Sequence, residues 1–359
     1  MHRLRSDISR PLLVVCGCVL LAVVFARLGP ARILSLLSSL GANFLVVVLI
    51  FSTHEIVRSL AVRLCLRVDP RPPLTEVLRI RLLGEAAGAL TRTGPFAAEP
   101  ARAWLLGSRG GQGLPGYAAA VGELIANSGT SAAVNVVVAG WALSSAALTG
   151  PVVVVAYVLF WGSLVHALVV VSAVASRVRI LGACARLAGL VPVVGRRLRV
   201  DPVKVREVED AISFTLRGRP GALAGIVLLE IAAQALLVCE AYWALRSMGL
   251  PVSLRSALLI EVMTRAVNLV QFVGTSEAGF AVVFTWLGMP AAVGFTLSLV
   301  QALRSLAAAG IGVSLLTALK WWTCPADRSR RAMGGDDFVP FAAERCNPIV
   351  DRRRRMGRT

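Results

Sequence analysis

Long apolar blocks, separated by short polar and basic stretches, set the pattern of this chain. Six blocks approach or exceed the 20 or so residues that an α-helix needs to cross the hydrocarbon core of a membrane. They lie at about 11–28, 40–60, 117–147, 151–175, 222–248 and 291–319. The pattern predicts an all-α polytopic membrane protein with about six full spans.

Two further apolar stretches carry charged residues and a central break. Residues 77–107 contain Gly94-Pro95 near the middle, and residues 254–289 contain Gly274. Each stretch predicts two half-length helices. Broken helices are tolerated at membrane depth only where they are buried in protein or line a wet cavity. We therefore expect two re-entrant helical hairpins.

The basic residues predict an orientation. If both hairpins return to the side from which they enter, and the N-terminus is cytoplasmic, the cytoplasmic stretches hold 30 Lys and Arg residues and the external ones hold 4. Such an excess is typical of the cytoplasmic side. We expect a multi-pass protein of the bacterial cytoplasmic (inner) membrane, with both termini in the cytoplasm.

This topology gives two units of opposite orientation, 40–147 and 222–319, each a span, a broken segment and a span. Gly113-Leu114-Pro115 and Gly288-Met289-Pro290 stand at matching places, each before the second full span of its unit. Inverted repeats with broken helices are typical of transporters. The alternative, chance recurrence of Gly and Pro in a Gly- and Ala-rich chain, stays open at this point.

The expected domain organisation is one integral membrane domain, 1–320, followed by a basic, disordered cytoplasmic tail, 321–359. Inside the domain, the loop 176–221 contains ten Lys and Arg residues. Part of this loop has the pattern of a short amphipathic helix on an anionic membrane surface. Simple determination of topology explains the same charges equally well.

Composition excludes several classes of function. The chain has 359 residues, 56% apolar and only 16% charged, which is too few charges for an ordinary soluble domain. The net charge of +18 is explained by basic loops, so no nucleic-acid partner is expected. Three histidines and seven cysteines without a Cys-x-x-Cys pair predict no metal and no cofactor. His54-Glu55 resembles the start of a zinc-protease motif, but Arg58 replaces the second histidine, and we expect no enzyme.

Ionisable residues inside apolar blocks mark candidate sites, because an unpaired charge there is costly. Glu99 and Arg102 are three residues apart on a helix and can pair, and an arginine near a helix start can hold a lipid phosphate. A pair that only locks the hairpin is the alternative. The candidate headgroup-binding residues are Arg92, Glu99, Arg102, Glu123, Arg265, Asn268, Glu277 and Arg304, with breaks at Gly94, Pro95 and Gly274. Glu230 and Glu240 are candidates for proton coupling.

Two motifs resemble those of a known family. Thr93-Gly94-Pro95 precedes Glu99-Pro100-Ala101-Arg102, and Gly274-Thr275-Ser276-Glu277 precedes Gly288-Met289-Pro290 and Arg304. These segments are similar to those of the flippase-like family, also called the lysylphosphatidylglycerol synthase transmembrane domain family. The resemblance implies movement of lipids or lipid-linked glycans, or assistance to enzymes that modify them. Because only about 40 residues follow the last span, we expect no aminoacyltransferase domain.

The sequence thus predicts a flippase-like translocase of a membrane phospholipid or lipid-linked glycan. Its headgroup would occupy a polar cavity between the two hairpins. The alternative is a non-transporting accessory protein that presents lipid to a separate lipid- or glycan-modifying enzyme. The lipid, the driving force and the oligomeric state are left open.

Overall fold

A computed structural model describes residues 19, 21–66, 71–91, 95–108, 113–145, 150–176, 206–210, 212–213, 218–267 and 275–317. The regular structure of these residues is helical. Apart from Leu316 and Thr317 at the end of the last helix, the main helices belong to one unit, Met1–Leu315, and a second unit comprises Leu316–Thr359. The predicted tail 321–359 lies outside the described residues.

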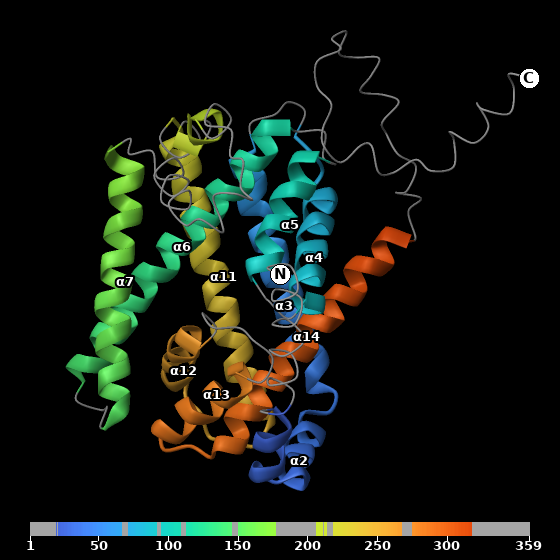
Figure 1. Ribbon diagram of the computed structural model, residues 1–359, viewed down its shortest axis with the longest axis vertical. Coiled ribbons are helices and arrows are strands. Elements are labelled where there is room, and N and C mark those ends of the chain that lie inside the picture. The colour runs from blue at the N-terminus through green and yellow to red at the C-terminus, as the bar shows by residue number, and fades with distance from the viewer. Residues whose placement is uncertain are drawn as a thin grey trace, which may run out of the picture. The chain divides into compact units, whose positions relative to one another are not determined.

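The main helices follow one another along the chain (Figure 1). They are α2 (Pro30–Leu40), α3 (Asn43–Cys65), α4 (Leu74–Thr91), α5 (Pro95–Ser108), α6 (Gly113–Ser144), α7 (Pro151–Ser176), α11 (Pro220–Ser247), α12 (Leu254–Val267), α13 (Thr275–Trp286) and α14 (Ala291–Thr317).

Four of the described helices contain a stretch that is long and apolar enough to cross a membrane: Asn43–Cys65, Pro151–Ser172, Pro220–Ser247 and Ala291–Gly312. A bent pair, Leu21–Leu28 and Pro30–Leu40, gives a fifth candidate if it is counted as one span. The six predicted spans therefore correspond to four or five candidates. Helix α6 has 32 residues, but Glu123, Asn127, Ser131 and Asn135 form a polar stripe at every fourth position.

The N-terminal region differs from the prediction, in which the residues between the first two spans, 11–28 and 40–60, form no helix. Residues Pro30–Leu40 form α2, bent by 87° from Leu21–Leu28. Gly29 allows the bend because its φ of 86° is accessible to glycine, and Pro30 suits the first position of a helix. Ile33 and Leu40 are buried, so packing of an apolar face stabilises this short helix.

Each predicted broken segment consists of two helices that pack against each other, α4 with α5 and α12 with α13. Three of these helices have 12 to 14 residues, or about 18–21 Å, which is less than the hydrocarbon thickness. In Figure 1 the first pair lies in the upper half of the unit and the second in the lower half. A close approach joins the second pair, since a Cβ on Gly279 would lie 2.2 Å from Val267 Cγ1.

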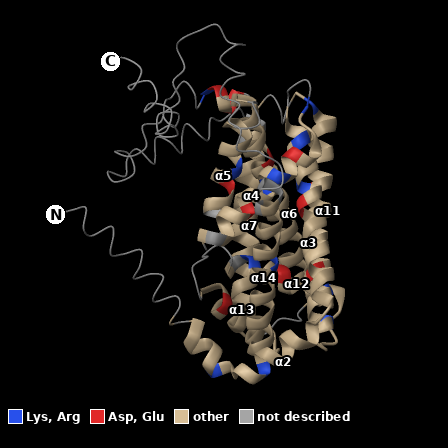
Figure 2. Cartoon of the chain, turned by 90° about the vertical axis from the view of Figure 1, so that its right-hand side faces the viewer, with Lys and Arg blue, Asp and Glu red and all other residues tan. Residues whose placement is uncertain are grey.

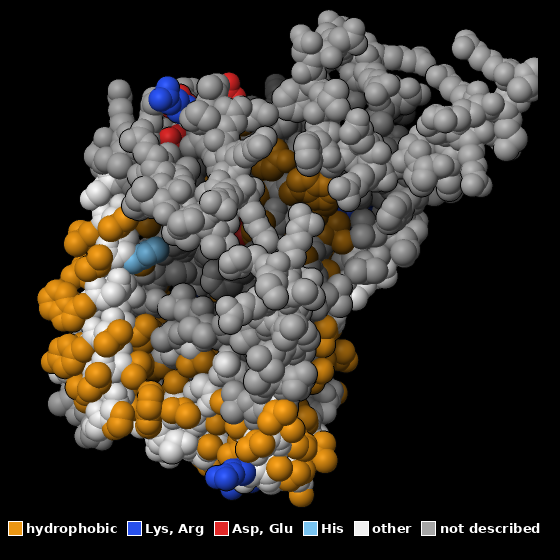
Figure 3. Space-filling model, in the orientation of Figure 1, with side chains coloured by type: hydrophobic (Ala, Val, Ile, Leu, Met, Phe, Trp, Pro, Cys, Tyr) orange, Lys and Arg blue, Asp and Glu red, His pale blue; other side chains and the backbone are white. Residues whose placement is uncertain are grey.

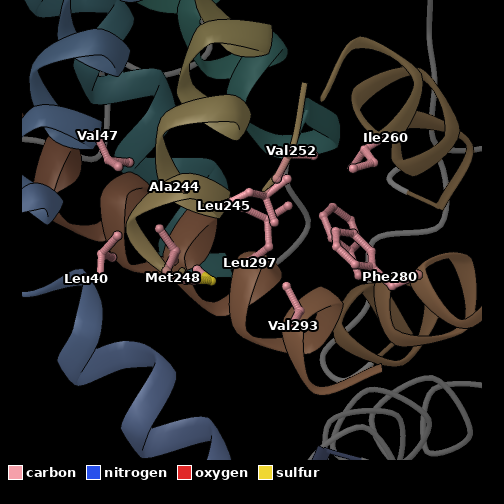
Figure 4. Packing of buried hydrophobic residues seen from close by; sticks show 12 residues of the cluster. Leu40, Val47, Ala244, Leu245, Met248, Val252, Ile260, Phe280, Val293 and Leu297 are labelled. Carbon is pink, nitrogen blue, oxygen red and sulfur yellow. The ribbon is translucent and has the colours of Figure 1, made fainter. Parts of the chain in front are cut away.

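Helices α3 and α11 pack along each other and connect the two pairs. The α4–α5 pair contacts α3 and α6, whereas α12 contacts α11, α6 and α7. Buried side chains from α11, α12, α13 and α14 form a core cluster, with Leu245, Ile260, Phe280 and Leu297 almost fully covered (Figure 4). This core positions the second pair of helices against α14.

The outer surface carries many apolar side chains. Helix α7 exposes Trp161, Val165 and Leu168 to more than half of their area. Figure 3 shows hydrophobic side chains over much of the described part of one face, while the prominent Lys and Arg side chains lie near its upper and lower ends. Such a surface is costly in water and suits contact with lipid chains.

Candidate functional site

A polar cavity of about 290 Å³ lies among six helices. Both short helix pairs contribute to it, through α4 and α5 from the first and α13 from the second, together with α3, α11 and α14. Charged and polar residues that line it are His54, Glu55, Arg58, Glu85, Glu99, Arg102, Ser276, Glu277, Ser298, Gln301, Arg304 and Ser305. The cavity therefore brings together residues from segments about 200 positions apart in the sequence.

Arg102 is a buried cation of this cavity that contacts three carboxylates. It donates hydrogen bonds to Glu99 on its own helix and to Glu85 on α4, and its Nη2 lies 3.8 Å from Glu55 Oε2. Only 4% of Arg102 is exposed. Its side chain crosses Gly84, where a Cβ would lie 2.2 Å from Arg102 Cγ. A glycine at position 84 thus allows the guanidinium to reach its three carboxylates.

A network of ion pairs continues from Arg102 into the protein. Arg81 Nε lies 3.1 Å from Glu55 Oε2, and Arg81 Nη1 lies 3.2 Å from Glu123 Oε1. Arg58 Nη2 lies 2.6 Å from the same Glu123 oxygen. Since all four side chains are nearly buried, each charge depends on its partners for stabilisation. The network ties α3, α4, α5 and α6 together behind the cavity.

A second ion pair lies on the α14 side. Arg304 pairs with Glu240 of α11, and its guanidinium stands 4.3 Å from the ring centroid of Phe51 on α3. Phe51 in turn stacks on His54, with ring centroids 5.6 Å apart. These contacts fix one wall of the cavity. In Figure 2 acidic and basic positions appear as isolated segments in otherwise uncharged helices, several of them on α4, α5 and α14.

The structure brings four of the predicted headgroup residues to one cavity: Glu99, Arg102, Glu277 and Arg304. Glu123 lies behind the cavity, in the ion-pair network. Their proposed role in binding a lipid remains a prediction.

The other predicted positions lie elsewhere or outside the described residues. Arg265 is not among the residues that line this cavity, and its Nε lies 3.5 Å from Glu261 on the same helix. Pro95 begins α5. The remaining positions, Arg92, Gly94, Asn268 and Gly274, lie outside the described residues.

Sequence reasoning missed Glu55, Arg58, Arg81 and Glu85 as members of the site. The spacing of these residues in the sequence was a signal for them. Glu55 and Arg58 are three residues apart, and Arg81 and Glu85 are four apart, so each pair lies on one face of an apolar helix. Charges repeated at helical spacing inside an apolar block point to a buried polar contact. The resemblance to a zinc-protease motif singled out His54-Glu55 as possible metal ligands, but Glu55 belongs to the buried ion-pair network.

The arrangement suits ionic binding. A guanidinium can hold a phosphate or carboxylate through two parallel hydrogen bonds, and the carboxylates of the cavity can accept hydrogen bonds from an amine or from sugar hydroxyls. Within the described ranges, no three His, Cys, Asp or Glu side chains are grouped so that they could hold a metal ion.

Comparison with known families shows which family the chain resembles. The family described as the lysylphosphatidylglycerol synthase TM region matches residues 11–312. The chain belongs to this family. The matched range covers both short helix pairs and every cavity residue, and it confirms the resemblance drawn from the Gly, Pro and Glu motifs. Membership in the lysylphosphatidylglycerol synthase TM region family, with several apolar helices, identifies a multi-pass membrane protein with a lipid-related function. Searches of curated proteins and of solved structures find no match.

Proposed function

We propose that this protein moves an anionic phospholipid or lipid-linked glycan across the bacterial cytoplasmic membrane. One observation carries the proposal: a single polar cavity is lined by both short helix pairs and by α3 and α14. A headgroup needs such a polar site to cross the hydrocarbon core, whereas acyl chains can stay in lipid. The protein would do this without a cofactor and without covalent chemistry.

The proposed topology has the two helix pairs re-entering the membrane from opposite sides. Support comes from the length of α5, α12 and α13, which is too short for a full span, and from the location of the pairs in opposite halves of the unit (Figure 1). The order helix, short pair, helix occurs twice, as α3 to α6 and as α11 to α14. An inverted repeat gives two related gates, which alternating access requires. Both termini are cytoplasmic in this proposal.

The proposed binding roles follow from the cavity lining. Arg102 on one side and Arg304 on the other would hold the phosphate, and Glu99 and Glu277 would accept hydrogen bonds from the rest of the headgroup. Because Arg102 already contacts three carboxylates, the phosphate would exchange with one of them rather than meet a bare charge. Exchange of this kind keeps binding weak enough for release.

The same contacts support a second candidate function. Three carboxylates around Arg102 are also what a structural lock between α3, α4 and α5 requires. In that case the protein would present lipid to a separate lipid- or glycan-modifying enzyme and would not transport it.

Reconstitution in liposomes distinguishes the two functions. The assay follows fluorescent anionic lipids in the inner leaflet, which become accessible to dithionite only when they are moved outward. Wild-type protein should expose them, and Arg102→Ala should not. Arg246→Ala is the matched control, because Arg246 is exposed at the end of α11, where it donates to Tyr242 Oη at 2.9 Å. Wild-type protein that moves no lipid of several classes would refute transport and favour the accessory function.

Cysteine labelling tests the topology. Single cysteines at positions 92 and 275, in a background without the seven native cysteines, should react with a membrane-impermeant reagent from opposite sides of the membrane. Labelling of both positions from the same side would exclude the inverted repeat.

A further inference from the structure

Glu230 on α11 is a buried carboxyl group that the proposed headgroup site does not use. It is 0% exposed, and neither of its oxygens accepts a hydrogen bond from a described donor. The nearest guanidinium atom, Arg58 Nε, is 3.7 Å from Glu230 Oε2, while Arg58 lies closer to Glu123. Glu123 on α6 is the neighbouring carboxyl group, because Arg58 contacts both: Arg58 Nη2 lies 2.6 Å from Glu123 Oε1. Two ionised carboxylates that share one guanidinium repel each other, and a proton on one of them removes this repulsion.

The charge balance of the network gives an independent argument. Among the described residues, the ion pairs connect five carboxylates, Glu55, Glu85, Glu99, Glu123 and Glu230, to only three guanidiniums, Arg58, Arg81 and Arg102. The neighbouring Arg304–Glu240 pair leaves this excess unchanged. Since uncompensated charge is costly in a buried site, protonation is expected to remove part of the excess.

The other four carboxylates are better stabilised than Glu230. Glu85 and Glu99 contact Arg102, and their side chains are 22% and 16% exposed at the cavity. Glu55 lies near Arg81, Arg102 and His54, whose Nδ1 is 3.2 Å away. Glu123 has two close guanidiniums, and Glu230 has one distant one. The proton therefore belongs to the Glu123–Glu230 pair.

The helices packed against α11 supply the groups that act on this pair. Helix α3 contributes Arg58 and the buried Cys65, α4 reaches it through Arg81, and α6 contributes Glu123. Helix α12 carries Glu261 and Arg265, which pair with each other. Helix α2 carries Arg32 and lies near the C-terminal end of α11, away from the half that carries Glu230 (Figure 1). With guanidiniums already beside both carboxyl groups, a proton suits the site better than a metal cation.

We propose that the Glu123–Glu230 pair is a proton-binding site linked to the headgroup cavity through Arg58. The inference rests on the proposed function for its ligand, an anionic headgroup. Arg58 lines the cavity and also contacts both carboxyl groups. When the pair is deprotonated, it holds Arg58. When one proton is bound, Arg58 is released to interact with an anion in the cavity.

The linkage works in both directions. An anionic headgroup draws Arg58 toward the cavity, which removes positive charge from the carboxyl pair and favours uptake of a proton from water. Release of the headgroup returns Arg58 to the pair, and the proton leaves as H⁺ to water. Thermodynamic reciprocity requires the two effects to be equal in free energy. A protonation event is thereby coupled to one binding event, and no other bond is formed or broken.

Binding of short-chain phosphatidylglycerol to the full-length protein in detergent tests this site without transport. Its phosphate diester does not titrate between about pH 6 and about pH 9, so a change of affinity reports on the protein. Wild-type affinity should fall as the pH rises, by at most about tenfold per pH unit for one proton. A pH dye in weak buffer should show proton uptake on binding. Glu230→Gln, which resembles the protonated state, should bind with little dependence on pH. The control Glu261→Gln should keep the wild-type slope.

Infrared spectroscopy of the wild-type protein tests the proton site even if the Glu230→Gln variant fails to fold. A carbonyl band of a protonated carboxyl group should be present near neutral pH and disappear on alkalinisation, and Glu230→Gln should lack it. Absence of such a titrating band from the wild type, a wild-type affinity independent of pH, or an equal slope in Glu230→Gln would each overturn the proton site. Binding with the expected slope but no lipid movement in liposomes would refute transport and keep the proton site. No phosphatidylglycerol binding at any pH would overturn both.

Discussion

The contact between Gly84 and Arg102 makes a sharp prediction about the cavity. Gly84 is buried in α4, and a Cβ at this position would lie 2.2 Å from Arg102 Cγ and 2.9 Å from Cδ. Carbon atoms in contact are about 3.5 Å apart, so Gly84→Ala must displace the Arg102 side chain by more than about 1 Å. The displaced atoms are in the middle of a side chain whose end is held by three carboxylates, so they cannot move without the guanidinium.

The loss of folding stability caused by Gly84→Ala follows from these contacts. Loss of a partner from a buried ion pair costs about 3–5 kcal/mol, and alanine recovers about 1 kcal/mol relative to glycine inside a helix. A net loss of stability of about 2–4 kcal/mol is expected. Transport should fall as far as in Arg102→Ala, because in both variants the guanidinium leaves its position at the cavity.

Thermal unfolding of the purified protein and the liposome assay measure the two effects. The matched control is Gly122→Ala, another buried helical glycine, where an added Cβ meets nothing within 4 Å. This control should keep the wild-type activity and unfold at an equal or higher temperature. If Gly84→Ala also keeps wild-type transport and stability, Arg102 is not held against α4 and the geometry of the cavity is wrong.

Two further predictions concern the second helix pair and the α14 wall. Gly279→Ala places a Cβ 2.2 Å from Val267 Cγ1 and should lower the unfolding temperature by several degrees. The double variant with Val267→Ala should recover most of the loss, and no recovery would mean that this contact is not the cause. Arg304→Met should destabilise the protein by about 3–5 kcal/mol, since it leaves Glu240 buried and unpaired. Adding Glu240→Met should restore the unfolding temperature but not transport, and restored transport would remove Arg304 from the headgroup site.

The proton site has a consequence for how the charges are arranged. A network in which every charge is compensated by a partner would hold the surrounding helices in one rigid arrangement. Here Arg58 is shared between Glu123 and the poorly compensated Glu230, so the network has two arrangements that differ by one proton. Alternation between two discrete arrangements is what allows a distant site to affect a cavity.

Local pattern predicted much of the fold. Apolar blocks of about 20 residues predicted α3, α7, α11 and α14 with ends close to those observed, because transfer of each residue into lipid contributes independently of its neighbours in space. The charged stretches with a central glycine predicted helix pairs at α4–α5 and α12–α13. The helix α2 was missed, since its stability depends on burial of Ile33 and Leu40 against other helices.

Ion pairs within one helix of the site could be predicted from the sequence, whereas ion pairs between helices could not. Glu99 and Arg102 pair within one helical turn, so spacing alone identified them. The contacts of Arg81 with Glu55 and Glu123 join residues 26 and 42 positions apart, and the Arg304–Glu240 pair joins α14 to α11. Hydropathy determines that a charge lies in an apolar helix and must find a partner. Which partner it finds depends on which helix faces meet in the tertiary structure, because ion pairing is short-ranged in space and does not depend on distance along the chain.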